Sequence, residues 1–485
     1  MASLREIVPP VPGIESSSPV PLPRPRLVAE HDRSAAPHFS RALHDRTQQI
    51  SLSYKKRIRE ALLLTFCDPI PKECLRLWLL TRREWQQALD WLDLSGLALY
   101  FLNRVERENL TGLLPDHVIV RLHRNLADNA ARTMALVAEW TSIQHSFQDL
   151  GLSFATLKGF SLGSPSVPRL ELRSQLDLDF LVAETSAPEA RRILEARGFR
   201  LRAVSGRSWE FAAHDSRPMF LRDLYKPTPN RFVELHIESA ASPSPLLDRV
   251  EMRRLHGLSV PVLDPIDLFL GQGLHIFKHL SGEFTRAAHM LEFRRHVMAR
   301  SHDSAFWCRL RMRAESDLRH PIGLGVVVLL ITRLMGDFAP RALTCWTVDR
   351  LTPAVRLWVE TCGYHAVFAD CPGTKLYLVL QEALASAGVP ARRPALQALV
   401  PRKLPPASLT PAPNEGLAIG LRRRWHRLRI ILIRARFHIV EGLRYLITAR
   451  RFRRQMTIAE CASASCSCSG SSSAPPRCSR PLTKQ

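Results

Sequence analysis

The chain has 485 residues, which is long enough for two or three domains. Its composition, 46% hydrophobic and 23% charged, is typical of a globular protein. Its net charge is +23, but residues 416–485 hold 15 Lys/Arg against two Glu, so +13 lies in this tail. The charge that would suggest a nucleic-acid-binding protein therefore belongs mainly to the C-terminal end, and the rest of the chain is not unusually basic.

Neither a targeting peptide nor a membrane-spanning segment is predicted. Residues 7–25 are rich in proline and serine and lack the apolar run of a signal peptide. The most apolar stretch, residues 323–335, is too short to cross a bilayer and contains Arg333. The ten cysteines show no CxxC spacing, and Cys466 and Cys468 in the Ser-rich tail lack the partners of a zinc site. We therefore predict a cytoplasmic protein.

The first part of the chain divides into a predicted disordered segment and a helical region. Residues 1–45 are rich in Pro, Ser and Arg, which predicts disorder. Residues 46–151 are predicted to be helical, because large apolar residues recur at helical spacing up to Gly151, a good helix stop. This stripe, whose tryptophans we expect in a core, consists of Leu75, Leu79, Trp85, Leu89 and Leu92, then Leu126, Ala130, Met134, Val137, Trp140, Phe147 and Leu150.

Between residues 152 and 240 the pattern changes from long helices to short strands. Pro188 stands at a typical first-turn position of a helix at 188–197, which Gly198 closes. Turn-forming residues, such as those at 227–230, separate the later strands. Strands are predicted at 154–157, 176–182, 209–212, 219–225 and 231–237.

Helical spacing returns over residues 262–388, after a segment that the sequence marks as a linker by its prolines. Asp264 or Asp267 is placed to cap the first helix of this region. The order of segments predicts an α+β protein, with a small mixed sheet between an N-terminal helical bundle and a C-terminal helical region. Beyond it we predict a Pro-rich linker at 389–415, a basic amphipathic helix at 416–456 and a disordered Ser/Cys tail at 457–485.

The most informative residues are two aspartates on one predicted strand. Asp177 and Asp179 lie two residues apart, so their carboxylates project from the same face. Such a pair is costly unless a cation lies between the two groups. Glu234 and His236 alternate with apolar residues on a later strand and share its polar face. Carboxylates in this number are what a phosphoryl- or nucleotidyl-transfer site needs to hold divalent cations.

Other signals surround these acids. Lys158 and Gly159 end the first strand, and Arg173 precedes the aspartates. A cation and a glycine that permits close approach of the backbone are features that a phosphate chain requires. Three motifs contain these residues: LKG at 157–159, R-x-x-x-D-x-D-x-L-V at 173–182 and E-L-H at 234–236.

Together the motifs resemble the uncharacterised nucleotidyltransferase family of the DNA polymerase beta-type superfold, over roughly residues 55 to 300. The resemblance implies a nucleotidyltransferase core at 152–240 that binds two Mg²⁺ ions, with Mn²⁺ as a substitute. Asp177 and Asp179 would hold both metals, and Glu234 would complete the site that activates the acceptor hydroxyl. The nucleotide-binding residues that it implies are Lys158, Gly159, Ser161 and Arg173.

The leading hypothesis is a Mg²⁺-dependent enzyme that transfers an NMP, in the first instance AMP from ATP, to a hydroxyl of a small molecule or protein. Two departures from the family pattern motivate an alternative, a catalytically weak or inactive member that binds a nucleotide or a partner. Glu234 stands where an aspartate is usual, and residues 164–172 lack the expected tyrosine and Asp-Pro. Arg173 either braces the aspartates or contacts the substrate.

Two further features have more than one interpretation. His275 and His279 stand at i and i+4 but lack the glutamate of an HExxH motif, which favours structural histidines or cleft helpers over metal ligands. His236 is a candidate contact to substrate or metal. Residues 417–455 interleave twelve arginines with apolar residues, so this helix either covers the protein's own core or contacts an anionic surface of membrane or nucleic acid.

Overall fold

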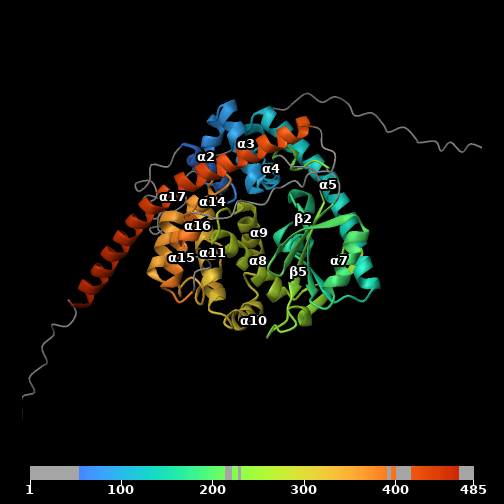
Figure 1. Ribbon diagram of the computed structural model, residues 1–485. Helices are drawn as coiled ribbons and strands as arrows, with labels where there is room; N and C mark the ends of the chain where they lie inside the picture. The colour runs from blue at the N-terminus through green and yellow to red at the C-terminus, as the bar shows by residue number, and fades with distance from the viewer. Residues whose placement is uncertain (1–53, 214–220, 228–230, 390–394, 400–416, 469–485) are drawn as a thin grey trace, which may run out of the picture. The chain divides into compact units, whose positions relative to one another are not determined.

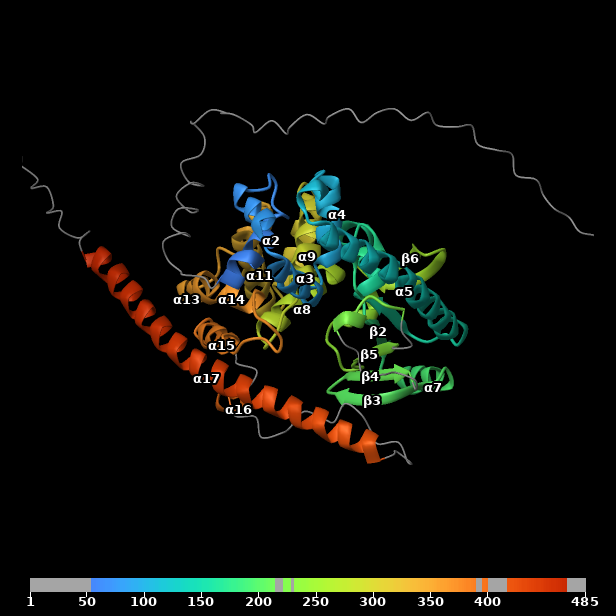
Figure 2. The ribbon, with the colours of Figure 1, turned by 90° about the horizontal axis from the view of Figure 1, so that it is seen from above.

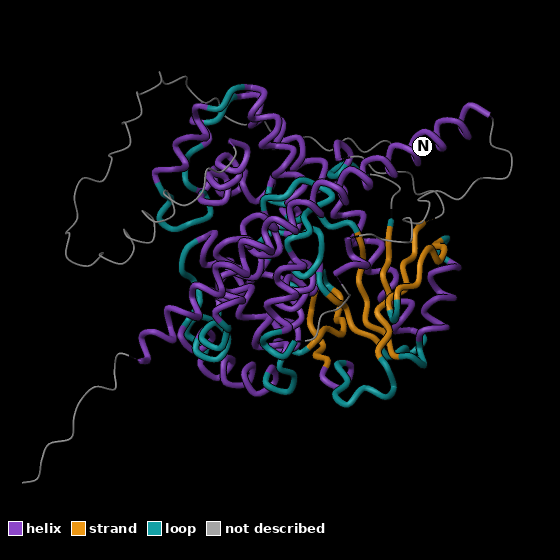
Figure 3. The backbone as a smooth tube through the Cα atoms, turned by 60° about the vertical axis from the view of Figure 1, so that its left-hand side comes forward, coloured by secondary structure: helices purple, strands orange, loops and turns teal. Residues whose placement is uncertain are grey.

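The computed structural model describes residues 54–213, 221–227, 231–389, 395–399 and 417–468. The predicted disorder at 1–45 lies outside the described residues, as do most of the predicted linker and residues 469–485 of the predicted tail. Seven strands form one mixed sheet, and helices make up most of the other described residues (Figures 1 and 3). The predicted mixed α+β class is therefore confirmed.

Long helices precede and follow the sheet. The helices before it are α2 (Tyr54–Leu64), α3 (Arg82–Ser95), α4 (Ala98–Arg107) and α5 (Asp116–Asp149), and the short α6 (Gly163–Ser166) and α7 (Ala187–Ala196) lie between strands. The later helices are α8 (Pro265–Leu280), α9 (Ala287–Ala299), α10 (Ser304–Ala314), α11 (Arg319–Met335), α12 (Arg341–Thr344), α13 (Pro353–Trp358), α14 (Tyr364–Val367), α15 (Tyr377–Ala385), α16 (Ala395–Leu399) and α17 (Leu417–Cys468). Shorter turns are η1 (Lys72–Leu79), η2 (Thr111–Leu113), η3 (Gly159–Ser161), η4 (Leu170–Leu172), η5 (Leu221–Asp223), η6 (Leu247–Arg249) and the π-helical η7 (Val359–Gly363).

The sheet has the strand order β3-β4-β5-β2-β1-β7-β6, which places β2 at its centre. β2 runs antiparallel to β1 and parallel to β5, and β1 runs parallel to β7. Figure 2 shows β2, β5, β4 and β3 in succession. The strands are β1 (Phe154–Leu157), β2 (Asp177–Ala183), β3 (Phe199–Ser205), β4 (Ser208–Ala213), β5 (Phe232–Glu238), β6 (Val250–Leu255) and β7 (Leu258–Leu263).

One face of the sheet is apolar and is covered by helices α5 and α7. Leu178 and Phe180 of β2 face this side and are buried, as the alternation of the strand predicts. Trp140 and Phe147 of α5 pack against them, together with Ile193 of α7. The aspartates alternate with these residues, so they lie on the opposite face of the sheet.

The helices before and after the sheet share a single hydrophobic core. Trp85 of α3 and Phe101 of α4 belong to the same buried cluster as Phe269 of α8 and Phe293 of α9. Helix α5 joins this core to the sheet, because its N-terminal Val118 packs in the helical cluster whereas its C-terminal half packs on the strands. The two helical regions, which the sequence separates by more than a hundred residues, are thus packed together.

Local signals explain where several helices begin and end. Thr81 and Glu84 form a reciprocal capping box at the start of α3, and Gly96 ends that helix in the left-handed conformation. Asp264 caps α8 by accepting a hydrogen bond from the Ile266 backbone N–H. Of the two predicted caps, Asp264 is therefore confirmed, whereas Asp267 is buried and pairs with arginines.

Some predicted elements were wrong. The sheet extends to Leu263, because β6 and β7 occupy the segment whose prolines suggested a linker. Of the strand predicted at 219–225, residues 219 and 220 lie outside the described residues, and Leu221–Asp223 form a 3-10 turn. Leu79 of the predicted helical stripe is 83% exposed, because it ends the turn η1 rather than lying within a long helix.

The described helices contain no segment long and apolar enough to cross a membrane. Helix α17, the longest of them, continues to Cys468, beyond the end predicted at residue 456. The first part of the predicted Ser/Cys tail is therefore helical.

Candidate active site

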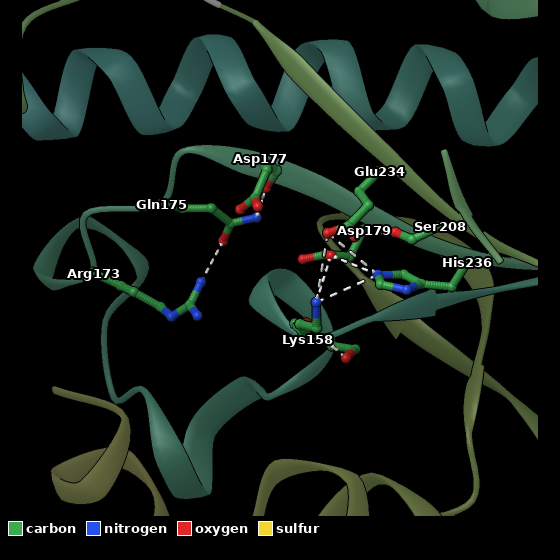
Figure 4. Close-up of polar contacts among 9 residues, drawn as sticks. Lys158, Arg173, Gln175, Asp177, Asp179, Ser208, Glu234 and His236 are labelled. Atoms are coloured by element: carbon green, nitrogen blue, oxygen red, sulfur yellow. Dashed lines mark hydrogen bonds and ion pairs between the residues drawn. The ribbon is translucent and has the colours of Figure 1, made fainter. Parts of the chain in front are cut away.

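Strand pairing brings four of the predicted site residues together. In the parallel pair β2–β5, Asp179 is aligned with Glu234 and Leu181 with His236, so these side chains share one face. In the antiparallel pair β1–β2, Leu157 lies opposite Asp179, and Lys158 follows directly. Figure 4 shows Lys158, Asp179, Glu234 and His236 converging at this point.

The Lys158 ammonium lies among the acidic and imidazole groups. Its Nζ atom is 2.8 Å from Asp179 Oδ1, 3.9 Å from Glu234 Oε2 and 3.4 Å from His236 Nε2. His236 Nε2 is itself 3.1 Å from Asp179 Oδ1 and 3.5 Å from Glu234 Oε2. Asp179 is buried, so its carboxylate depends on these partners for compensation of its charge.

The charges in this cluster stabilise one another. Hydrogen bonds from His236 and Ser208, with the nearby Lys158 ammonium, hold the pKa of Glu234 well below its usual range. Burial alone would lower the pKa of His236, but its hydrogen bonds to Asp179 and Glu234 raise it. Burial also opposes the charge on Lys158, yet Asp179 and Glu234 raise its pKa above the ordinary value. At neutral pH the cluster therefore contains an ionised Glu234 and a protonated Lys158.

A divalent cation fits the ligands that meet here. Asp179, Glu234 and His236 each offer one ligand atom, and these atoms all lie within 4.8 Å of one another. Across the described part of the chain, this is the one group of three or more His, Cys, Asp or Glu side chains with that geometry. Two carboxylates with an imidazole suit Mn²⁺ or Zn²⁺, and the carboxylates alone suit Mg²⁺. The Lys158 ammonium already supplies positive charge at the same place, so a bound cation would compete with it for Asp179.

Asp177 lies outside this three-residue group although it shares the face of Asp179. It lines a pocket of about 280 Å³ whose wall also includes Arg202, Glu210 and Glu234. Burial, and then the neighbouring Asp179, raise the pKa of Asp177 to about 6. The pocket therefore presents one guanidinium and three carboxylates, one of which, Glu234, also belongs to the three-residue group.

The raised pKa of Asp177 predicts a pH-dependent stability. A folded-state pKa of about 6 lies above the ordinary 3.8, so the folded protein binds this proton more tightly than the unfolded chain. This stabilising contribution is complete below pH 3.8 and is lost as the pH rises through about 6. Urea unfolding in EDTA should show that the wild type loses free energy of unfolding relative to Asp177→Asn as the pH rises across this window. An equal fall in the variant would contradict the assignment.

Gly159 allows a close approach that only glycine permits. Its φ is +37°, and a Cβ built there would overlap the side-chain amide of Gln175. Gln175 accepts a hydrogen bond from Arg173 Nη1 at 3.0 Å and donates one to the Asp177 backbone carbonyl at 2.8 Å. Arg173 thus braces the start of β2 through Gln175 and does not contact either aspartate directly (Figure 4). Ser161 is buried, and its hydroxyl donates to the Lys158 carbonyl at 2.7 Å.

Gly159→Ala is expected to lower the free energy of unfolding by about 2–4 kcal/mol, because backbone strain and overpacking add. Gly163→Ala is a matched control, since Gly163 has φ +55° in the same loop but its Cβ would meet no described atom within 4 Å. Strain alone should cost the control about 1–2 kcal/mol. Urea unfolding measures both, and Gln175→Ala should recover part of the loss in Gly159→Ala. Equal losses at the two glycines would exclude the contact with Gln175.

Three histidines form a separate cluster on α8 and α9. The ring centroids of His275 and His279 are 4.5 Å apart, and that of His289 lies 5.2 Å and 6.0 Å from them. Burial, and then the charge of Lys158, lower the pKa of His275 to about 2, and burial lowers the pKa of His279 and His289. These imidazoles are therefore neutral. Their surroundings are positive, which favours an anion over a metal ion.

Several residues of the site were missed from the sequence. Ser208 donates to Glu234, and Glu210 is the cross-strand neighbour of Glu234 on the same face. The alternation of β4 was the one signal that could have suggested them. Glu292 is 1% exposed and accepts hydrogen bonds from Arg173 Nε at 3.1 Å and from the Tyr100 hydroxyl at 2.9 Å. Nothing in the local sequence pattern distinguishes Glu292 from a surface residue of α9.

The clustered residues fall within a segment that matches a known family. The profile described as uncharacterised nucleotidyltransferase matches residues 81–335, which is more than half of the chain. No curated protein sequence matches the chain. The matched segment contains the whole sheet, the acidic cluster and the histidines of α8 and α9. By this match, the chain belongs to the uncharacterised nucleotidyltransferase family.

Proposed function

We propose that this protein transfers a nucleoside monophosphate from a nucleoside triphosphate to a hydroxyl group. The observation that carries the proposal is the convergence of Asp179, Glu234 and His236 around the Lys158 ammonium, within the segment that the family matches. The ligand set suits a divalent cation, and we propose Mg²⁺ with Mn²⁺ as a substitute. When bound, such a cation would supply positive charge against the triphosphate oxygens and the departing pyrophosphate.

The charges on the two sides of the cluster would orient the substrates. Lys158 and Arg173 contribute to the positive potential felt by the neutral His275, and Arg286 adds to it at His289. This side attracts a triphosphate, to which neutral imidazoles can donate hydrogen bonds. The pocket beside Asp177 carries three carboxylates and would repel a triphosphate, so we propose that the acceptor hydroxyl enters from there.

The two acids that the sequence singled out beside Asp179 would have different roles. Burial and the neighbouring Asp179 raise the pKa of Asp177, as is expected for two close carboxylates with no cation between them. This supports Asp177 as a further metal ligand. Glu234 has its pKa held far below neutrality, which makes it a poor proton acceptor. We therefore propose that Glu234 acts through its charge and not as a general base.

A second candidate function is nucleotide binding without turnover. Two observations favour it: the Lys158 ammonium already compensates Asp179, and Glu234 replaces the aspartate usual in the superfold. A lysine in this position can neutralise the carboxylates with no metal bound. This candidate predicts that ATP binds without any transfer product.

The discriminating experiment combines calorimetry with a transfer assay on the same preparation. The protein is incubated with each α-³²P-labelled NTP, Mg²⁺ or Mn²⁺ and a panel of sugars, nucleosides and proteins as hydroxyl acceptors. We expect a labelled acceptor and released pyrophosphate, most abundant with ATP, and none in EDTA. Binding of ATP with no product on any acceptor would support the second candidate. Absence of both binding and transfer would overturn both.

A further inference from the structure

Helix α17 has two faces of different character. Its inner face is buried against the body through Phe437, Tyr445 and Phe452. Helix α17 contacts α13 and α15, and Figure 2 shows it beside α15. Polar contacts fix the orientation of the helix: Thr374 Oγ1 donates to Glu441 Oε2 at 2.6 Å, and Arg434 Nη1 donates to Glu283 Oε2 at 2.9 Å. Tyr445 also donates to Glu382. The rotation of α17 about its axis is therefore set by specific contacts.

The outer face carries an apolar stripe. Large apolar side chains recur along it every three or four residues, except between Leu432 and Ile439, where the step is seven residues, and this spacing places them in one line on a helix. Opposite the buried residues, this stripe consists of Leu421, Trp425, Leu428, Leu432, Ile439, Leu443 and Leu446, each 45–70% exposed. The interpretation that this helix covers the protein's own core is therefore confirmed for the inner face, whereas the stripe on the outer face is left exposed.

Arginines border the apolar stripe. Residues 421–458 contain Glu441 as their only acidic residue, and its carboxylate is turned inward to Thr374. The exposed arginines of the outer half of the helix include Arg424, Arg429, Arg436 and Arg454 beside the stripe, and Arg450 in line with it. The outer face is thus apolar along most of the stripe and strongly positive beside it and at its C-terminal end.

We propose that the outer face of α17 docks on an anionic lipid bilayer, with the helix lying in the plane of the interface. An apolar stripe buried at the boundary of headgroups and acyl chains, with arginines reaching the phosphates beside it, is the arrangement of an interfacial helix. A second copy of the chain would bring two rows of arginines together, which is unfavourable. A nucleic acid would pair with the arginines but leave the aliphatic stripe in water.

The test is sedimentation of the full-length protein with phosphatidylcholine vesicles, either pure or containing phosphatidylglycerol. We expect binding to the anionic vesicles and little to the neutral ones. The triple variant Leu432→Glu/Ile439→Glu/Leu443→Glu should bind about tenfold more weakly or worse, because it places carboxylates in the stripe. A variant with Arg436, Arg450 and Arg454 changed to Gln should also weaken binding. All six side chains are exposed, so circular dichroism and thermal unfolding should match the wild type.

Leu79→Glu is the matched control, because Leu79 is exposed but lies in the turn η1, far from α17 in the sequence. It should bind vesicles as the wild type does. Failure of the wild type to bind anionic vesicles, or unchanged binding by the stripe variant, would overturn the proposal. If the wild type does not bind vesicles, and both the wild type and the stripe variant bind RNA in a salt-sensitive manner, the outer face would be a nucleic-acid-binding surface instead. A wild-type dimer that the stripe variant converts to a monomer, with no vesicle binding, would identify self-association.

Discussion

Asp179→Asn is expected to reduce nucleotidyl transfer by about 100- to 1000-fold, the typical cost of losing one preorganised charge at a reacting centre. Asp179 is the shared partner of the cluster: its Oδ1 atom lies 2.8 Å from Lys158 Nζ and 3.1 Å from His236 Nε2. The amide keeps the shape of the carboxylate but cannot offset a cation. Mn²⁺ affinity, measured by electron paramagnetic resonance, should fall at least about tenfold, a readout that does not require turnover.

Asp267→Asn provides a control of similar burial. Asp267 is 4% exposed against 5% for Asp179, and it is held by Arg249 and Arg313 away from the cluster. Its loss should lower the free energy of unfolding and leave Mn²⁺ affinity unchanged. Unaltered metal affinity and transfer in Asp179→Asn would remove this residue from the site, whatever the result for the control.

The site residues that could be predicted from the sequence are those whose placement depends only on their near neighbours along the chain. The i, i+2 spacing of Asp177 and Asp179 fixes their shared face, because side chains in any strand alternate. The same alternation on β5 places Glu234 and His236 together. Burial of Leu178 and Phe180 follows from that pattern too, and the structure confirms it.

Long-range pairing could not be read from these patterns. The alignment of Asp179 with Glu234 depends on the register between β2 and β5, which lie more than fifty residues apart. That register is what makes His236 a ligand candidate and leaves Asp177 outside the group. Likewise, the prolines of residues 243–265 suggested a linker, so β7 was not predicted. Val260 and Val262 of β7 are buried, and this strand lies between β1 and β6. Periodicity shows which face a residue occupies but does not identify the strand beside it.

The packing of the two helical regions has a direct consequence for the site. Tyr100 of α4 and Arg173 before β2 both donate to Glu292 of α9. One buried carboxylate therefore joins a helix that precedes the sheet in the sequence, a helix that follows it and the loop that leads into β2. Arg173 then holds Gln175, and Gln175 holds the Asp177 backbone. Through this chain of contacts, the helical core positions the start of β2.

Glu292→Leu is therefore expected to lower the free energy of unfolding by about 3–5 kcal/mol, because it leaves the partly buried Arg173 guanidinium without its carboxylate. Tyr100→Phe, which removes one neutral donor, should cost only about 1 kcal/mol. The double variant Arg173→Leu/Glu292→Leu should lose less than the sum of its single variants, since it leaves neither charge unpaired. Urea unfolding of the four proteins with wild type gives these energies. If the losses in free energy of unfolding are additive, Arg173 and Glu292 are not energetically coupled. The helical core would then not position the start of β2 through this pair.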